Sequence, residues 1–444
     1  MLLAEQSLAA LIAGEHPCTC GKTHSTSLKY LKVGAGVIRH LPDALKALNA
    51  RKPFIICDVN TKAAAWSPVK DVLETHSIPW VLYMLENPRP EPDEHTVGAI
   101  TMAFDPTCDV IIALGSGVIN DCCKVLAHTA GLRSLSICTA PSMDGYTSNS
   151  SSMIRDRIKV TLYNDCPGAV LADTDIMKEA PMHMLHAGLG DMLAKYISIC
   201  EWRLSHAIID EYYCENIAGL VRASLAKVVK AAPGLVKRDA AAVEAVAEGL
   251  LLSGLAMDFA EVSRPASGLE HYFSHLWEMM ALERGTASEL HGIQVGVGTI
   301  LTLRLFEKIK KIVPDRAKAE QFIATFTNSK WEEQTRSIFG SAADTVIRQE
   351  HEQFRKNDPA RHAVRLTRIL SIWPDLLRII DEELPSLTDI ESLAKSVGMP
   401  TEPADIGISR EDTARAFIAS RDIRDKYLTS SLLWDLGLLY DIII

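Results

Sequence analysis

The sequence predicts an α/β N-terminal domain built on a parallel sheet, followed by an all-α C-terminal domain. Short apolar runs alternate with helical stretches through the first third of the chain. These runs are almost continuously hydrophobic, which is typical of strands covered by helices on both faces. From about residue 173, strand-like runs disappear and helix formers dominate to the end. We therefore place the two domains at 1–175 and 176–444.

Each predicted element follows from a local pattern. Runs rich in β-branched and apolar residues, ended by Asp, Gly or Pro, indicate strands, and longer stretches of helix formers indicate helices. The expected strands cover 53–58, 80–85, 109–114 and 134–139, with helices over 61–76, 93–104 and 117–130. A hairpin strand is expected at 158–163, and the main C-terminal helices at 240–257, 291–312 and 362–380.

Composition bounds the function. Lys and Arg total 46 against 56 Asp and Glu, so the net charge is −10, which argues against nucleic acid or an anionic membrane as the main partner. No uninterrupted apolar run approaches the ~20 residues that span a bilayer, and the first residues lack the basic front of a signal peptide. We therefore expect a cytoplasmic protein. Most of the ten cysteines lie in apolar surroundings, as buried free thiols do.

A glycine turn is the first candidate site. The segment 114–121, LGSGVIND, joins a predicted strand to a helix. Glycines there allow close backbone approach, and free N–H groups at a helix start favour a phosphate. A plain tight turn explains the segment equally well. Asp58, at the end of another strand, either accepts hydrogen bonds from a ribose or simply caps the helix that follows.

A hydroxyl-rich loop follows the fourth predicted strand. It includes Thr139, Ser142, Asp144 and Ser148. The carboxyl ends of parallel strands meet at one edge of a sheet, so this loop and the glycine turn are expected side by side. The composition suits a cofactor's phosphate and ribose or a polyol. The alternative is a solvated serine-rich loop.

The helical half offers a metal constellation. His271 and His275 are four residues apart and share one helix face, while Asp191 and His291 lie in glycine-punctuated segments. One Asp and two His would form a three-ligand site with an open position, as in catalytic metal centres. The alternative is that the histidines are core residues and that Asp191 caps a helix.

A second cysteine pattern lies near the N-terminus. Cys18, Cys20 and His24 resemble a metal knuckle, but the sequence offers no obvious fourth ligand. A tight turn with two free thiols is the favoured interpretation. Cys122 and Cys123 fall inside a predicted helix and are interpreted as packing residues.

Taken together, these motifs resemble the sn-glycerol-1-phosphate dehydrogenase family, most closely its bacterial members associated with arabinose utilisation. The similarity rests on SRPASGLEHYFSH at 263–275, TAPSMDGY at 139–146, GSGVIND at 115–121 and GDMLAKY at 190–196, with RDKY at 424–427 and LGLL at 436–439. It extends from about residue 17 to about residue 440. This family belongs with glycerol dehydrogenases, iron-type alcohol dehydrogenases and dehydroquinate synthases.

The resemblance implies a Rossmann-like N-terminal domain, a helical C-terminal domain as in dehydroquinate synthases, NAD(P), and one divalent ion (Zn, Ni or Fe). Asp191, His271 and His291 fall on the positions of the metal ligands and catalytic residues. Asp144, Asp191 and His275 fall on substrate-binding positions. The cofactor-binding positions are Asp58, Gly115, Ser116, Gly117, Val118, Ile119, Thr139, Ala140, Pro141, Ser142 and Ser148.

The activity implied is reversible NAD(P)H-dependent reduction of dihydroxyacetone phosphate to glycerol 1-phosphate. Arg264, Lys195 and the free N–H groups of the helix after residue 268 are candidate partners of the substrate phosphate. The acidic Asp58 favours NAD over NADP, and a homodimer or larger homo-oligomer is expected. The alternatives are a glycerol dehydrogenase, a dehydroquinate-synthase-like cyclase, or a non-enzymatic helical interaction protein.

Overall fold

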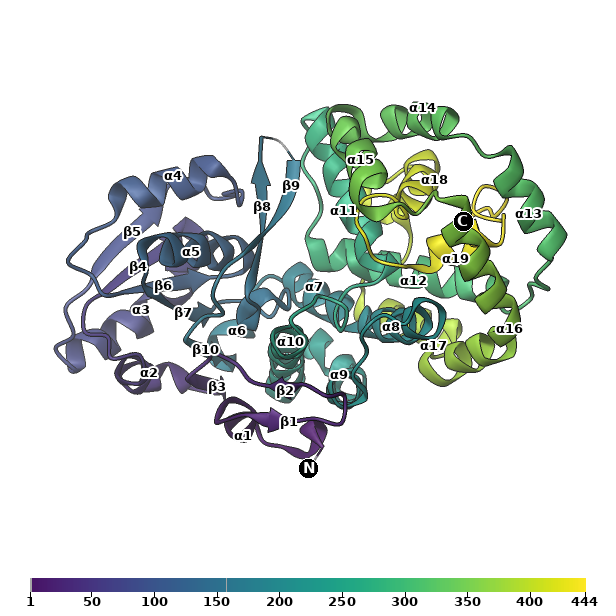
Figure 1. Ribbon diagram of the computed structural model, residues 1–444. Helices are drawn as coiled ribbons and strands as arrows, with labels where there is room; N and C mark the ends of the chain where they lie inside the picture. Colours follow the sequence, from purple (N-terminus) through teal and green to yellow (C-terminus); the bar gives the residue numbers. More distant parts are fainter. Residues whose placement is uncertain (1, 157) are drawn as a thin grey trace. The chain divides into compact units, whose positions relative to one another are not determined.

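The computed structural model describes residues 2–156 and 158–444, and Figure 1 shows the order of its elements. The chain forms two compact units, each described here by itself. The first comprises 1–192, 214–266 and 396–399, and the second comprises 193–213, 267–395 and 400–444. The predicted domain limits at 175 and 176 stay a prediction.

The first unit is built on a six-stranded sheet in which every neighbouring pair runs parallel, which confirms the predicted fold class. Its order is β3 (Tyr30–Gly34), β10 (Ala169–Asp173), β7 (Arg133–Cys138), β6 (Val110–Gly115), β4 (Pro53–Asp58) and β5 (Val81–Leu85). The four predicted strands are each within one residue of those observed. β3 and β10 were not predicted. β3 is an edge strand with exposed Lys32, and β10 is a short, fully buried run.

Both faces of the sheet are buried, as the apolar runs predict. In β4, Ile55 and Cys57 enter one hydrophobic core, while Phe54 and Ile56 enter another on the opposite face. The connecting helices are α2 (Leu41–Ala47), α3 (Val59–Thr75), α4 (Glu94–Ala103) and α5 (Gly117–Ala130). At about 25 cal/mol per Å² of apolar area, this two-sided burial is a main source of the unit's stability.

The strand order reverses between β4 and β6. β5 lies on one side of β4, whereas the chain then crosses to β6 on its other side and continues outward through β7 and β10. In open parallel sheets, ligands bind beyond the carboxyl ends of the strands at such a reversal. Asp58 and Gly115 are the last residues of β4 and β6, so the fold places both at this point.

Further elements of the first unit surround the sheet. The hairpin β8 (Ser150–Arg155) with β9 (Ile158–Tyr163) confirms the strand predicted at 158–163. The remainder are β1 (His16–Pro17), β2 (Thr23–His24), α1 (Leu8–Ile12), α6 (Thr174–Met177), most of α7 (Met182–Leu193), α9 (Glu215–Ala231) and α10 (Ala240–Ala260). α10 is long and apolar enough to cross a membrane, but 67% of its most apolar window is buried, as in core helices of globular proteins.

Helices make up the second unit. They are α8 (Lys195–Ile209), α11 (Leu269–Arg284), α12 (His291–Ile309), α13 (Arg316–Thr325), α14 (Asn328–Phe339), α15 (Ala343–Gln349), α16 (Pro359–Glu383), most of α17 (Leu387–Val397), α18 (Arg410–Ala419) and α19 (Thr429–Asp435). α11 and α12 approach closely at Gly298, where a Cβ would lie 2.6 Å from the Glu270 carbonyl oxygen. This contact fixes which sides of the two histidine-bearing helices face each other.

Candidate functional site

The glycine turn and the hydroxyl-rich loop meet at the predicted edge of the sheet. The Thr139 N–H donates to the Gly115 carbonyl oxygen over 3.1 Å, and the hydroxyls of Ser116 and Ser142 are 2.6 Å apart. Position 115 has room only for glycine, because the Cβ of any other residue would lie 2.6 Å from the Ile119 Cβ. The expectation that these two segments lie side by side is confirmed.

The start of α5 suits an anion. Ser116 occupies the N-cap position but makes no side-chain cap, since its hydroxyl is directed to Ser142. The N–H groups of the first helical turn, which begins at Gly117, therefore receive no hydrogen bond from the usual capping side chain. Unsatisfied N–H groups and the helix dipole together favour a phosphate.

Asp58 is a helix cap, as its simpler interpretation predicts. One carboxylate oxygen, Oδ1, accepts hydrogen bonds from the Asn60 and Thr61 N–H groups at 2.7 and 2.8 Å. The Thr61 hydroxyl in turn accepts from the Asp58 N–H, completing a capping box. The cap fixes the carboxylate at the strand reversal. Contact with an adenosine ribose stays a prediction.

A buried lysine that the sequence analysis missed organises the hydroxyl-rich loop. The Lys124 ammonium pairs with Asp121 at 3.0 Å and donates to the Gly145 carbonyl oxygen at 3.1 Å. It also reaches the Ser148 hydroxyl at 3.4 Å, and that hydroxyl donates to Gly145. The sequence feature that could have revealed this role is a lysine among apolar neighbours on α5. A charged side chain is buried at such a position only when it has partners.

Two predicted substrate residues meet in the first unit. The Asp144 N–H donates to Asp191 Oδ2 at 3.0 Å, and the Ser253 hydroxyl donates to Asp144 Oδ2 at 2.9 Å. Asp191 is fully buried. Glycines permit this approach, because a Cβ on Gly188 would lie 1.8 Å from the Pro141 carbonyl oxygen and one on Gly254 would lie 2.5 Å from that of Asp144.

The second unit brings three histidines together. The ring centroids of His271 and His291 are 5.2 Å apart, those of His275 and His291 are 5.7 Å apart, and those of His271 and His275 are 6.3 Å apart. His271 and His275 are buried on α11, and half-buried His291 begins α12. The two histidines that are four residues apart on α11 thus face His291, the first residue of α12. The sequence pattern predicted that His271 and His275 share one helix face.

Hydrogen bonds assign the tautomers of two of these rings. His271 Nδ1 donates to the buried Glu270 carboxylate at 2.8 Å. The Ser274 hydroxyl donates to Gln294 at 3.0 Å, so its oxygen accepts from His291 Nδ1, also at 3.0 Å. In the neutral form of each ring, Nε2 is then the nitrogen that carries no proton. A histidine held in this way through its other nitrogen is the usual form of a metal ligand, so the residues fit a divalent ion.

His275 is suited to a different role. Burial, followed by the positive charge of Arg424, keeps the pKa of His275 well below its usual value, so the ring is neutral. Its Nδ1 is buried without a hydrogen-bond partner in the described chain. It lies 3.8 Å from Glu278, which sequence reasoning missed although it stands three residues after His275 on the same face.

Glu278 belongs to a second group of side chains that could hold a metal ion. Donor atoms of His275, Glu278 and His291 all lie within 4.8 Å of one another. The Glu278 carboxylate faces Nδ1 of His291, at 3.5 Å, and Nδ1 is the protonated nitrogen in the tautomer assigned above. Glu278 therefore lies beside both rings, and in this arrangement its carboxylate faces the N–H group of His291. The structure places Asp191 in the first unit and the histidines in the second.

One expectation about the substrate phosphate is wrong. The first N–H groups of α11 are already occupied, because Leu269 N donates to Glu201 at 2.8 Å and Gly268 N donates to Glu270 at 2.7 Å. Two buried carboxylates at this helix start would repel an anion. The other candidates, Arg264 and Lys195, are each 1% exposed.

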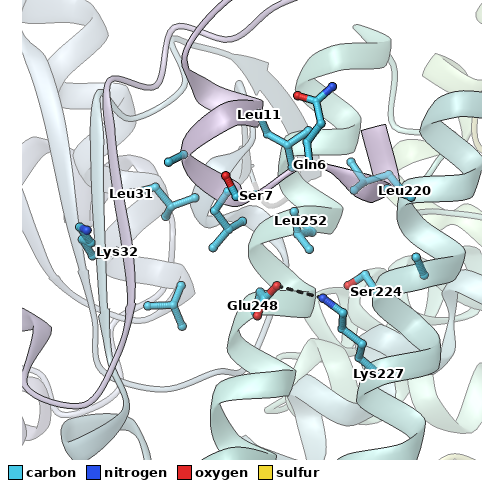
Figure 2. A pocket seen from close by; sticks show the side chains of 15 residues that line it. Gln6, Ser7, Leu11, Leu31, Lys32, Leu220, Ser224, Lys227, Glu248 and Leu252 are labelled. Carbon is cyan, nitrogen blue, oxygen red and sulfur yellow. Dashed lines mark hydrogen bonds and ion pairs between the residues drawn. The ribbon is translucent and has the colours of Figure 1, made fainter. Parts of the chain in front are cut away.

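A cavity of about 400 Å³ lies elsewhere in the first unit (Figure 2). Its walls come from the N-terminal segment, β3, α9 and α10, and Lys227 pairs with Glu248 across it at 3.5 Å. Among the described residues that line it, none was predicted to bind cofactor, substrate or metal.

Comparison with known proteins supplies the family. Residues 32–181 match the model of the iron-containing alcohol dehydrogenases. A glycerol-1-phosphate dehydrogenase [NAD(P)+] of Halalkalibacterium halodurans is 31% identical over 89% of this chain and 90% of its own length. The protein of the same name from Bacillus licheniformis is 30% identical over 78% and 89%. The chain belongs to the glycerol-1-phosphate dehydrogenase family. This confirms the resemblance read from the motifs.

Solved structures agree on the fold. A probable glycerol dehydrogenase from Sinorhizobium meliloti aligns with a TM-score of 0.58 at 16% identity, covering 93% of this chain and 96% of its own. A maleylacetate reductase from Rhizobium sp. aligns with a TM-score of 0.61 at 12% identity, covering 94% and 96%. At these identities the likeness concerns the fold alone.

A first prediction tests the close approach of α7 to the hydroxyl-rich loop. In Gly188→Ala, the new methyl group must displace the Pro141 carbonyl, so the loop moves away from Asp191. We expect kcat/KM to fall at least tenfold and the unfolding midpoint to fall as well. Gly98→Ala on α4 is the matched control, since nothing lies within 4 Å of its Cβ. It should stabilise the helix by about 0.5–1 kcal/mol. Equal activities in both variants would contradict the prediction.

Proposed function

We propose that this chain is an NAD(P)- and divalent-metal-dependent glycerol-1-phosphate dehydrogenase that reversibly reduces dihydroxyacetone phosphate to glycerol 1-phosphate. The main support for this proposal is the match to a protein named glycerol-1-phosphate dehydrogenase [NAD(P)+], which covers 89% of this chain and 90% of that relative. The histidine cluster, with two rings held through Nδ1, supports it independently. We further propose a cytoplasmic homo-oligomer acting on a phosphorylated small molecule.

The cofactor is proposed to bind at the reversal between β4 and β6. The residues assigned to it are Asp58, Gly115, Ser116, Gly117, Val118, Ile119, Thr139, Ala140, Pro141, Ser142 and Ser148. When bound, NAD(P)H supplies the hydride. The α5 N–H groups would hold the pyrophosphate, and the Ser116–Ser142 hydroxyl pair would donate to it. Lys124 keeps the loop in place through Gly145.

Asp191, His271 and His291 are proposed to hold the metal ion, whether Zn, Ni or Fe. When bound, such an ion would polarise the substrate carbonyl and stabilise the negative charge that develops there. Glu270 fixes the His271 ring. Neutral His275 is proposed to hydrogen-bond the substrate, with Asp144, and to pass the proton needed at the carbonyl oxygen. Burial of the His271 and His275 rings limits the access of water to them and strengthens their electrostatic contacts.

The second prediction concerns metal binding. His271→Ala should abolish activity and remove the catalytic ion while the far-UV circular dichroism stays native, because Nε2 is lost. Glu270→Gln keeps the ring but weakens its orientation, so metal affinity should fall about 10- to 100-fold. Metal content is measured by mass spectrometry and affinity by competition with a chelator. Full occupancy in His271→Ala would remove this residue from the ligand set.

The third prediction concerns cofactor choice. Asp58 stands at the end of β4, and a carboxylate there repels the 2′-phosphate of NADP. The wild type should therefore prefer NAD, and Asp58→Ser should narrow the difference while its hydroxyl preserves the cap. Steady-state kinetics with both cofactors measure the ratio of kcat/KM values. A wild type that uses NADP as well as NAD would contradict this role.

We propose that Arg424 recognises the substrate phosphate. Because the chain carries a net charge of −10, its own field does not attract an anion, and a local cation is needed. Arg424 is half-buried, and its charge acts on His275. A guanidinium beside the proposed reaction centre matches phosphate geometry, whereas the start of α11 is filled by carboxylates.

The fourth prediction follows. Dihydroxyacetone phosphate should be a far better substrate than dihydroxyacetone, and Arg424→Gln should lower kcat/KM for the phosphorylated substrate about 10- to 100-fold, the loss of one charge-assisted contact. Its activity with dihydroxyacetone should hardly change. Arg378→Gln, an exposed arginine paired with Asp375, is the control. Equal specificity constants for both substrates would indicate a glycerol dehydrogenase, and turnover without net change of NADH would indicate a cyclase.

A further inference from the structure

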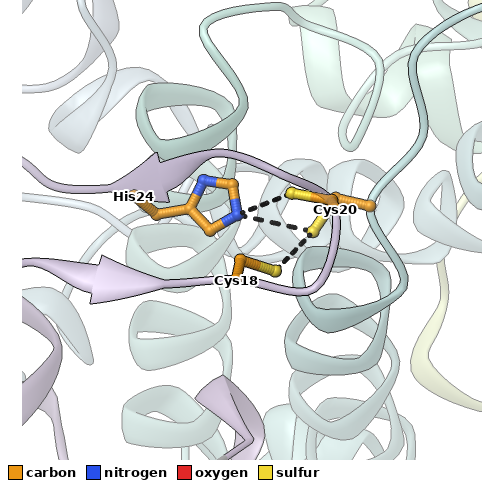
Figure 3. A group of neighbouring side chains, drawn as sticks. Cys18, Cys20 and His24 are labelled. Atoms are coloured by element: carbon orange, nitrogen blue, oxygen red, sulfur yellow. Dashed lines mark hydrogen bonds between the residues drawn. The ribbon is translucent and has the colours of Figure 1, made fainter.

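The fold completes the cysteine pattern near the N-terminus. Cys18 and Cys20 lie in the turn between β1 and β2, and His24 ends β2 (Figure 3). The fourth residue, Cys214, immediately precedes α9 and is 190 residues away from His24 in the sequence. These four residues, here called the Cys18 cluster, all belong to the first unit.

The distances within the Cys18 cluster match a tetrahedral metal site. Cys20 Sγ and Cys214 Sγ lie 3.4 and 3.5 Å from His24 Nε2, and Cys18 Sγ lies 3.5 Å from Cys214 Sγ. All four donor atoms lie within 4.8 Å of one another. Zinc bonds of about 2.3 Å to sulfur and 2.0 Å to nitrogen separate tetrahedral ligands by roughly 3.5–3.8 Å. A disulfide needs about 2.05 Å, so at these distances Cys18, Cys20 and Cys214 are not joined by disulfides.

Surrounding contacts aim these atoms inward. The buried His24 ring bonds the Phe259 carbonyl oxygen through Nδ1 at 2.9 Å. Since that nitrogen must donate, Nε2 is the nitrogen of the neutral ring that can bind a metal ion, and it faces the sulfurs. The Asn216 amide donates to Cys18 Sγ at 3.3 Å, as partners of ligand atoms do in metal sites. Cys214 stands at the N-cap position of the 17-residue α9 and is fully buried beside the other three donors.

The turn itself is built for this arrangement. The Gly21 N–H donates to the Cys18 carbonyl oxygen at 3.1 Å, and the Cys18 N–H donates to the Lys22 carbonyl oxygen at 3.0 Å. Gly21 has φ +86°, a left-handed conformation that favours glycine. The bend places both cysteine side chains on the side of His24 and Cys214. A simple turn with two free thiols does not require this convergence.

We propose that the Cys18 cluster binds a structural zinc ion, separate from the ion of the dehydrogenase reaction. Three thiolates and one imidazole close the coordination sphere, so no position remains for substrate or water. Soft sulfur ligands exclude magnesium and calcium. The ion would fasten the β1–β2 hairpin to the start of α9, and His24 would extend the connection to the end of α10.

The first experiment measures metal content by mass spectrometry on the full chain, purified without an affinity tag under reducing conditions from zinc-supplemented medium. The wild type should hold about one zinc per chain at this site, retained in His271→Ala and lost in Cys18→Ser and in Cys214→Ser. Cys108→Ser, which changes a buried thiol elsewhere in the first unit, should retain it. Because the His271→Ala arm excludes the dehydrogenase ion, this outcome does not depend on the proposed function.

The second experiment uses the wild type, so that a misfolded variant cannot decide the matter. Cobalt(II) exchanged into the protein should give intense visible bands of tetrahedral geometry and a thiolate charge-transfer band, both lost when an organomercurial blocks the thiols. Loss of zinc should lower the unfolding midpoint. The proposal would be overturned by absence of zinc in the wild type, by unchanged zinc in Cys18→Ser and Cys214→Ser, by iron in place of zinc, or by a disulfide within the cluster.

Discussion

Close backbone approach at glycine is the constraint on which the candidate residues of each unit depend. In the first unit, α7 and α10 press against the hydroxyl-rich loop at Gly188 and Gly254, where a Cβ would overlap backbone oxygen. In the second, Gly298 lets α12 meet the backbone of Glu270. Interiors are packed too densely to absorb a methyl group at such points. The positions of Asp144 and the three histidines therefore follow from residues that carry no functional group.

Buried charges orient the site once the backbone is in place. Glu201, Glu270 and Lys124 are almost completely buried, and each has several hydrogen-bonding partners. Isolated burial of such groups costs several kcal/mol per ion, and good geometry only offsets this cost. These buried charges therefore contribute mainly by positioning neighbouring groups, and not by adding stability. Glu201 ties the start of α11 to Thr429, Glu270 holds the His271 ring, and Lys124 holds the loop at Gly145.

The sequence predicts what is encoded in local patterns. Strands buried on both faces are visible as apolar runs, and His271 with His275 is visible as a spacing of four. The residues that contact them in the folded chain are harder to predict from the sequence. Gln294 matters because its oxygen accepts from Ser274 and so sets the His291 tautomer, a relation between two helices. Cys214 is separated from its cluster by most of the first unit. The edge strand β3 was missed because its exposed side carries a lysine.

Two features of the first unit converge on α10. Near its middle, Ser253 and Gly254 support the loop that carries Asp144. Near its C-terminal end, the Phe259 carbonyl is one of the last carbonyls of the helix, which lack a partner within it, and His24 supplies that partner. The same carbonyl fixes the His24 tautomer that zinc requires. An ion in the Cys18 cluster would thus hold the end of a helix whose middle supports Asp144, the proposed substrate residue. This gives the N-terminal hairpin a structural connection to Asp144 through α10.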